Sequence, residues 1–170
     1  MKPRAIVYTS NTGHTAAYAA LLSERIDLPA YTLDEAMKQL QKGCPIIYLG
    51  WIMAGKVKGY KKAERRFDVR VACGVGMTAG GMNADRLRKT TFIRDDIDLH
   101  AIPGGFELDK LTGPVGAIMR RVSKRTARDL RAKPKRTPAE EEMLMLMTRG
   151  AALIDPERLN RLAAWYAEQK

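Results

Sequence analysis

Five short apolar runs alternate with helix-forming segments along this 170-residue chain, and this alternation restricts the fold more than any other feature. The runs are Ala5–Thr9, Ala30–Leu33, Pro45–Gly50, Val69–Cys73 and Leu99–Pro103. Each run is continuous in its hydrophobicity, which is typical of parallel strands that are covered by helices on both faces. The pattern therefore predicts βαβ units and a three-layer α/β fold.

The chain is long enough for one domain with one hydrophobic core, and we expect 1–170 to form that single domain. Five strands joined by helices suit a doubly wound parallel sheet in the order 2-1-3-4-5. In this topology ligands bind beyond the carboxyl ends of the strands, at the switch point between the first and third strands. The turn that follows the first strand is therefore the first candidate for a binding site.

Residues 109–149 do not fit this minimal plan, because they are too many for a plain connection between the fifth strand and the last helix. The helix-like run Pro114–Lys133 is followed by the break Pro134–Pro138 and then by a second helix with three glutamates in its first turn. We predict a basic helical insertion here. A last helix is expected to begin at Asp155, which suits a cap followed by proline.

The first helix of the insertion is amphipathic in sequence. Its apolar residues are expected on one side: Val115, Ile118, Met119, Val122 and Leu130. Its basic residues occupy the remainder: Arg120, Arg121, Lys124, Arg125, Arg128, Arg131 and Lys133. Such a helix can lie on an anionic membrane surface, or it can pack on its own domain with its basic face in solvent. The sequence leaves both interpretations open.

The whole chain is basic, with 30 lysines and arginines against 19 acidic residues and a net charge of +11. This balance favours an anionic partner, namely an acidic lipid surface, an acidic protein or nucleic acid. Nucleic acid is disfavoured, because the basic run contains no aromatic residue for stacking and the sequence contains no recognised nucleic-acid-binding module. A soluble protein that is merely basic is the alternative.

Apolar patterning and residue usage exclude further classes of protein. No apolar run approaches the ~20 residues needed to cross a bilayer, and Met1–Arg4 leads into a strand without the apolar segment of a signal peptide. We therefore predict a cytoplasmic location. The two histidines and two cysteines are not clustered, so no metal site is predicted. Cys44 and Cys73 adjoin apolar runs and are expected to be buried structural thiols.

The turn after the first strand concentrates hydroxyl groups and one glycine where a helix begins. Its residues are Ser10, Asn11, Thr12, Gly13, His14 and Thr15. A helix start presents unpaired N–H groups and the positive end of the helix dipole, so this turn can bind phosphate through amides and hydroxyls. The sequence contains neither the G-K-[ST] of a P-loop nor a G-x-G-x-x-G fingerprint. Taken alone, the turn could also be an ordinary polar helix cap.

The run Ile6–Thr15, continuing to Ala19 and Leu22, resembles the flavodoxin signature over its whole length. The resemblance implies that residues 10–15 wrap the phosphate of flavin mononucleotide (FMN). It also implies that the segments after the third and fourth strands flank the flavin ring, which adds Trp51, Ile52, Met53, Ala54, Gly55, Gly74, Val75, Gly76 and Met77 to the cofactor-binding residues. An aromatic face can stack on a flavin, and backbone N–H groups near the glycines can reach its polar atoms.

Ordinary flavodoxins carry acidic residues around the flavin, whereas here four lysines follow the middle segment: Lys56, Lys58, Lys61 and Lys62. A closer resemblance is to the bacterial flavodoxin-like protoporphyrinogen oxidases, which are basic and carry a helical insertion before the last helix. The residues that carry this likeness are Leu49–Gly55, Pro103–Gly105, Ile118–Arg121 and Gly150–Leu159.

This second resemblance implies an FMN-dependent oxidoreductase with porphyrinogen and quinone as partners, peripheral on the inner face of the cell membrane. The flavin itself would transfer the electrons, so no catalytic side chain is assigned. The alternative is an FMN electron carrier for an acidic protein partner.

Overall fold

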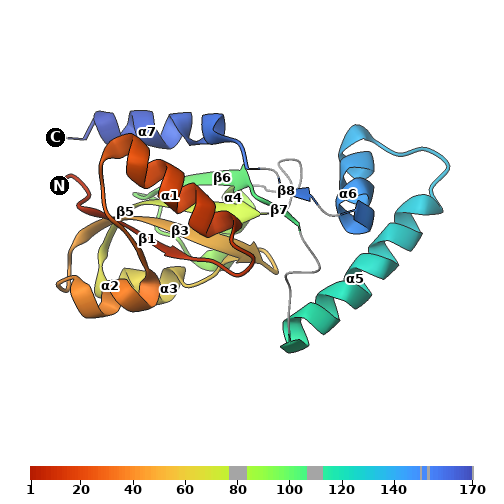
Figure 1. Ribbon diagram of the computed structural model, residues 1–170, viewed down its shortest axis with the longest axis horizontal. Helices are drawn as coiled ribbons and strands as arrows, with labels where there is room; N and C mark the ends of the chain where they lie inside the picture. The colour runs from red at the N-terminus through yellow and green to blue at the C-terminus, as the bar shows by residue number, and fades with distance from the viewer. Residues whose placement is uncertain (77–83, 107–112, 150, 153, 170) are drawn as a thin grey trace.

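A computed structural model describes residues 1–76, 84–106, 113–149, 151–152 and 154–169 (Figure 1). At its centre lies a parallel sheet whose strands are β1 (Ala5–Thr9), β2 (Ala30–Thr32), β3 (Pro45–Met53), β5 (Asp68–Gly76) and β6 (Asp98–Pro103). The strands stand in the order β2-β1-β3-β5-β6, and the short β4 (Lys56–Val57) pairs antiparallel with β3. The predicted α/β fold with a parallel sheet is confirmed.

Helices cover both faces of this sheet (Figure 1). One face carries α1 (His14–Ile26) and α7 (Asn160–Ala167), which follows the 3-10 turn η2 (Pro156–Leu159). The other face carries α2 (Leu33–Gln39), α3 (Tyr60–Arg66) and α4 (Ala84–Thr91). The sheet is thus the middle of three layers, as the continuous apolar runs predict.

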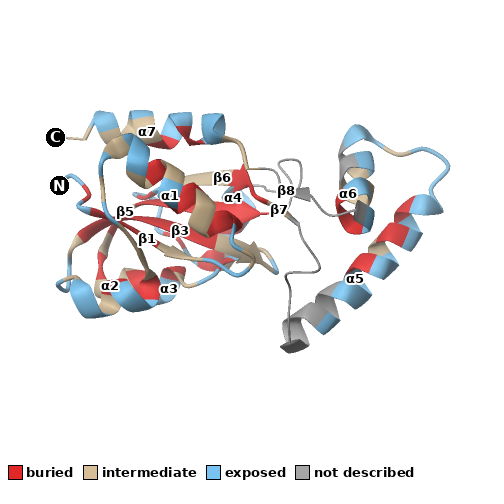
Figure 2. Ribbon diagram, in the orientation of Figure 1, coloured by how far each residue is buried: buried red, intermediate tan, exposed pale blue. Residues whose placement is uncertain are grey.

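Alternate residues of the central strands enter two hydrophobic cores, one on each face, which Figure 2 shows as buried strands between partly exposed helices. In β3, Ile46 and Tyr48 join the core under α2 and α3, whereas Ile47 and Leu49 join the core under α1 and α7. Cys73 is fully buried, and burial raises the pKa of its thiol to about 12. Cys44 is only half-buried, so the expectation of a buried thiol is confirmed for Cys73 alone.

Two strands run further than the sequence predicts. The segment after Gly50, which lies beyond the predicted third strand, continues β3 to Met53 and returns through β4 as a hairpin. Its turn residues Ala54 and Gly55 both have positive φ, as a type I′ hairpin turn requires. Similarly, β5 continues past Cys73 to Gly76, because the missing side chain of Gly74 leaves room for Ile52 and Leu87 in the packed layer.

The predicted insertion forms two helices, α5 (Gly113–Arg131) and α6 (Pro138–Arg149), which project from the sheet domain (Figure 1). A two-stranded ladder of β7 (Gly105–Phe106) and β8 (Ala151–Ala152) joins the insertion to the domain. Lys133 and Arg136 form ion pairs with Glu140 and Glu141 across the turn between the helices.

Of the apolar face predicted for α5, Leu130 is confirmed as buried and Val122 is not. Ser123, Ala127 and Leu130 are buried where α5 packs on α6, whereas Val122 is 47% exposed. The three buried positions are spaced by four and three residues and form one stripe, and Val122 lies about 100° around the helix from Ser123. The side chains of Val115, Ile118 and Met119 lie outside the described part of the structure.

Because α5 and α6 bury a small core of their own, Leu146→Ala should lower the free energy of unfolding by about 2–3 kcal/mol. Leu146 is 2% exposed, and its neighbour Met145 is 59% exposed. Met145→Ala is therefore the matched control and should change stability by less than about 0.5 kcal/mol. Urea unfolding of both variants measures the difference. Equal effects would mean that the two helices do not pack as described.

Candidate functional site

The register of the sheet brings the predicted site segments to one edge. Thr9 pairs with Gly50, Gly50 with Gly74, and Gly74 with Ala101, so the carboxyl ends of β1, β3, β5 and β6 are level. The turn after β1 therefore lies beside the ends of β3 and β5. This edge contains the switch point between β1 and β3, where ligands bind in sheets of this topology.

The helix that follows β1 begins in a way that suits an anion. Gly13 precedes α1 with a φ of 94°, and among the described residues no side chain caps the amino end of this helix. The first turn of α1 contains no acidic residue. By contrast, α2 begins with a capping box in which Thr32 and Glu35 satisfy each other's backbone. The start of α1 thus has no side-chain cap, and the positive end of its dipole suits an anion.

The side chains of residues 10–15 divide into two groups. Ser10, Asn11 and Gly13 are exposed, whereas His14 and Thr15 are buried. Thr12 is half-buried, and its Oγ1 lies 2.8 Å from Nδ1 of His14. The buried pair His14 and Thr15 fixes the turn, so the groups that face solvent are the side chains of Ser10 and Asn11 and the backbone around Gly13.

Tyr18 fixes the position of α1 relative to the far edge of the sheet. Its hydroxyl donates to the carbonyl of Pro103 at 2.8 Å and accepts from the N–H of Asp155 at 3.1 Å. Burial is the main cause that raises the pKa of this phenol. One side chain therefore joins α1 to the end of β6 and to the start of η2, which the spacing of residues in the sequence does not reveal.

The hairpin of β3 and β4 is attached to the end of β1. The carbonyl of Lys58 accepts hydrogen bonds from Thr9 Oγ1 at 2.8 Å and from the Tyr48 hydroxyl at 2.7 Å. Burial raises the pKa of Tyr48, which keeps it a neutral donor. On the other side, the N–H of Val57 donates to Thr91 Oγ1 at 3.0 Å. The hairpin is thereby held between the end of β1, which directly precedes the turn of residues 10–15, and α4.

The residues predicted to flank the flavin ring differ in burial and in position. Trp51, Ile52 and Met53 are half-buried residues of β3, and Ala54 and Gly55 form the hairpin turn. Gly74, Val75 and Gly76 are buried within β5, and Met77 lies outside the described residues.

Two of these side chains are used in packing. A β-carbon added at Gly74 would lie 2.9 Å from Ile52, and one added at Gly104 would lie 2.5 Å from Val75. Among the members of this group that the structure describes, Trp51 and Met53 are therefore the side chains best placed for a ligand.

A depression beside the turn contains a cation that the sequence analysis did not assign to the site. Its walls come from β1, the turn, α1, the start of α2 and α3, and they include Ser10, Asn11, Asp34 and Lys62. Lys62 Nζ lies 2.9 Å from Asp34 Oδ1, and this ammonium group lowers the pKa of the Asp34 carboxyl. The run of lysines is visible in the sequence, but only the tertiary fold shows that Lys62 borders this depression.

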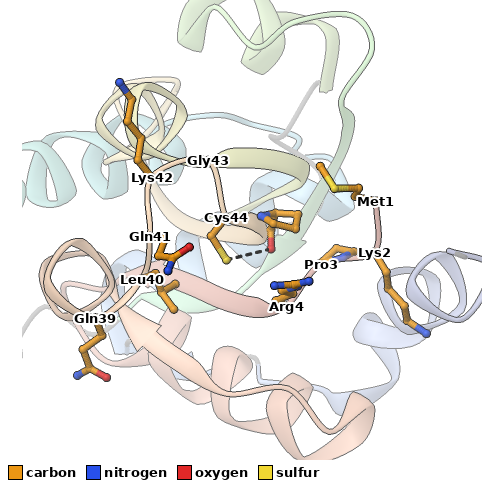
Figure 3. Close-up of a pocket in the computed structure, with 11 residues that line it drawn as sticks. Met1, Lys2, Pro3, Arg4, Gln39, Leu40, Gln41, Lys42, Gly43 and Cys44 are labelled. Carbon is orange, nitrogen blue, oxygen red and sulfur yellow. Dashed lines mark hydrogen bonds between the residues drawn. The ribbon is translucent and has the colours of Figure 1, made fainter.

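A second depression lies at the opposite, amino end of the sheet (Figure 3). Its walls are Met1–Arg4 and Gln39–Pro45, and none of the predicted site residues lies in it. Figure 3 shows that Lys2 and Lys42 point away from each other and from the centre, while the Cys44 thiol donates to the carbonyl of Pro45 at 3.8 Å. Lys2 and Lys42 are thus directed outward, and Arg4 is the cation that remains near the Cys44 thiol.

Two negative findings apply to the described ranges of the chain. They contain no group of three His, Cys, Asp or Glu side chains that could hold a metal ion. No helix within them is long and apolar enough to cross a bilayer. Comparisons of the chain with protein-family models, with curated proteins and with solved structures found no match.

Proposed function

We propose that this chain is an FMN-dependent oxidoreductase that holds the FMN phosphate at residues 10–15. The observation that supports this best is the start of α1, which has no side-chain cap and follows Gly13 at the switch point of the sheet. In the turn before it, Ser10 and Asn11 are exposed to solvent. These amide and hydroxyl donors match the acceptor oxygens of a phosphate monoester.

The ring of the bound flavin would lie along the edge of the sheet towards the end of β3. Trp51 and Met53 are the half-buried side chains available there for stacking, and the hairpin is fixed by Thr9, Tyr48 and Thr91. Flavin supplies hydride and single-electron transfer when bound, and the protein contributes position and electrostatics. For this reason no side-chain acid or base is part of the proposal.

The basic surroundings favour an anionic reaction partner. Lys56 and Lys58 are exposed on the hairpin beside Trp51, and a carboxylate-bearing molecule would meet them first. A porphyrinogen with its propionates, oxidised at the expense of a quinone, suits this charge and the resemblance carried by Leu49–Gly55. The exposed cations of α5 suit a peripheral position on an anionic membrane, where quinone is dissolved. An acidic redox protein is the second candidate, on the same lysines.

The experiment that tests the proposal is an absorption spectrum of the purified protein after FMN addition, followed by an anaerobic assay with protoporphyrinogen and a soluble quinone. A perturbed flavin spectrum together with quinone reduction supports the enzyme. A perturbed spectrum without turnover of any porphyrinogen supports the electron carrier. A free-flavin spectrum with undiminished fluorescence at micromolar protein would refute both.

A further inference from the structure

The turn that would hold the phosphate contains no lysine or arginine, although a phosphate monoester carries about −1.5 to −2 charges at neutral pH. We infer that Lys62 of α3 is a cation that acts on this phosphate from outside the turn and that its ion-pair partner Asp34 offsets most of its charge in the wild type. This inference rests on the proposed function for the position of the phosphate. It assigns a role in ligand selection to two residues outside the turn.

Two adjacent lysines of α3 point towards different neighbours. Lys62 borders the same depression as Ser10, Asn11 and Gly13 and forms its ion pair with Asp34. Lys61 instead donates to Glu64 at 2.8 Å and to the carbonyl of Phe92 at 2.6 Å, next to the end of α4. Of these two lysines, Lys62 is therefore the one placed to act on an anion at the turn.

The start of α3 is fixed next to the end of β1. A β-carbon added at Gly59, the residue before α3, would lie 2.6 Å from Thr9 Cγ2, and Thr9 directly precedes the turn. The carbonyl of Lys58 accepts from Thr9 Oγ1 as described above. The backbone that carries Lys62 is thus held beside the turn by packing, whatever its side chain does.

The ion pair itself contributes little to stability. The side chains of Lys62 and Asp34 are 58% and 82% exposed, and ion pairs in such positions are weakly stabilising. A phosphate at the turn would experience one positive and one negative charge that largely cancel. Removing Lys62 alone leaves a repelling carboxylate, whereas removing Asp34 alone leaves an attracting ammonium group.

Four variants separate a role of Lys62 and Asp34 in phosphate binding from a purely structural role of their ion pair between α2 and α3. The test set is Lys62→Gln, Asp34→Asn and the double variant, and Lys61→Gln is the matched control on the same helix. At low salt we expect FMN to bind about tenfold more weakly to Lys62→Gln and severalfold more tightly to Asp34→Asn, with the double variant near wild type. Lys61→Gln should change affinity less than twofold.

Two further measurements make the charge effect specific. Riboflavin, which lacks the phosphate, should bind all variants equally, and the differences for FMN should shrink in ~0.5 M salt because exposed charges are screened. Equal FMN affinities for Lys62→Gln and Lys61→Gln would overturn the inference. So would parallel losses of FMN and riboflavin affinity in Lys62→Gln, because these would report a change in structure.

Failure of the proposed function gives a different result. If FMN does not bind at all, inorganic phosphate serves as the probe, and the backbone amide NMR shifts of Ser10, Asn11 and Gly13 report its binding. The same order of affinities among the variants would support the role of Lys62 while refuting FMN. Absence of any phosphate-induced shift at these amides in the wild type would refute the inference as well.

Discussion

Replacing Gly59 with alanine should lower the free energy of unfolding by about 3 kcal/mol, at least as much as Leu146→Ala. Gly59 has a φ of 79°, and a β-carbon there would lie 2.3 Å from the Tyr48 hydroxyl and 2.6 Å from Thr9 Cγ2. Tyr48 cannot move aside easily, since it is fully buried and donates to the carbonyl of Lys58. The substitution should also weaken FMN binding, because Thr9 precedes the turn.

Gly43→Ala is the matched control for this prediction. Gly43 has the same φ of 79°, but a β-carbon added there meets nothing within 4 Å. Its replacement should therefore show only the backbone effect of about 1 kcal/mol. Urea unfolding gives both values, and their difference measures the steric contribution at the junction of β1, the hairpin and α3. Equal losses for the two variants would show that this junction is not packed as described.

Replacing Ser10 with glutamate should weaken FMN binding by at least about 100-fold while leaving riboflavin binding nearly unchanged. Ser10 is exposed, lines the depression and belongs to a turn without acidic residues. A carboxylate at this position would face the phosphate directly, both repelling it and competing for the N–H groups at the start of α1. Because the side chain is exposed, the substitution should leave the fold intact.

Gln39→Glu adds the same charge on the exposed end of α2 and serves as the control. It should change FMN affinity less than threefold at ~0.1 M salt, because charges further away than the Debye length are screened. Fluorescence titration with FMN and riboflavin measures all four affinities. An unchanged FMN affinity in Ser10→Glu would move the phosphate away from residues 10–15.

The strands of this fold could be predicted from the sequence because buried parallel strands are continuous apolar runs. Their ends could not, because the ends depend on contacts between distant residues. Gly50 ends one apolar run and Gly74 follows another, yet both lie inside strands, where missing side chains make room for Val57 and Leu87 respectively. The prediction that Val122 lies on the buried side of α5 is wrong for a similar reason, since the position of α6 decides which stripe is buried.

In the candidate site too, features set by neighbouring residues could be predicted, whereas features set by contacts between distant residues could not. The turn after β1 is a local pattern of hydroxyls and glycine at a helix start, and it could be predicted. Lys62, Tyr18 and Tyr48 act across the fold, and they could not be predicted from spacing alone. Tyr18, for example, donates to a carbonyl 85 residues later in the chain.

The central claim, FMN with its phosphate at the start of α1, is tested most directly by an NMR titration of the isotope-labelled protein with FMN. We predict that the largest amide shifts fall on residues 10–16, that smaller shifts appear on the hairpin near Trp51, and that riboflavin reproduces only the latter. Shifts confined to other parts of the chain, or no shifts at millimolar FMN, would contradict the claim.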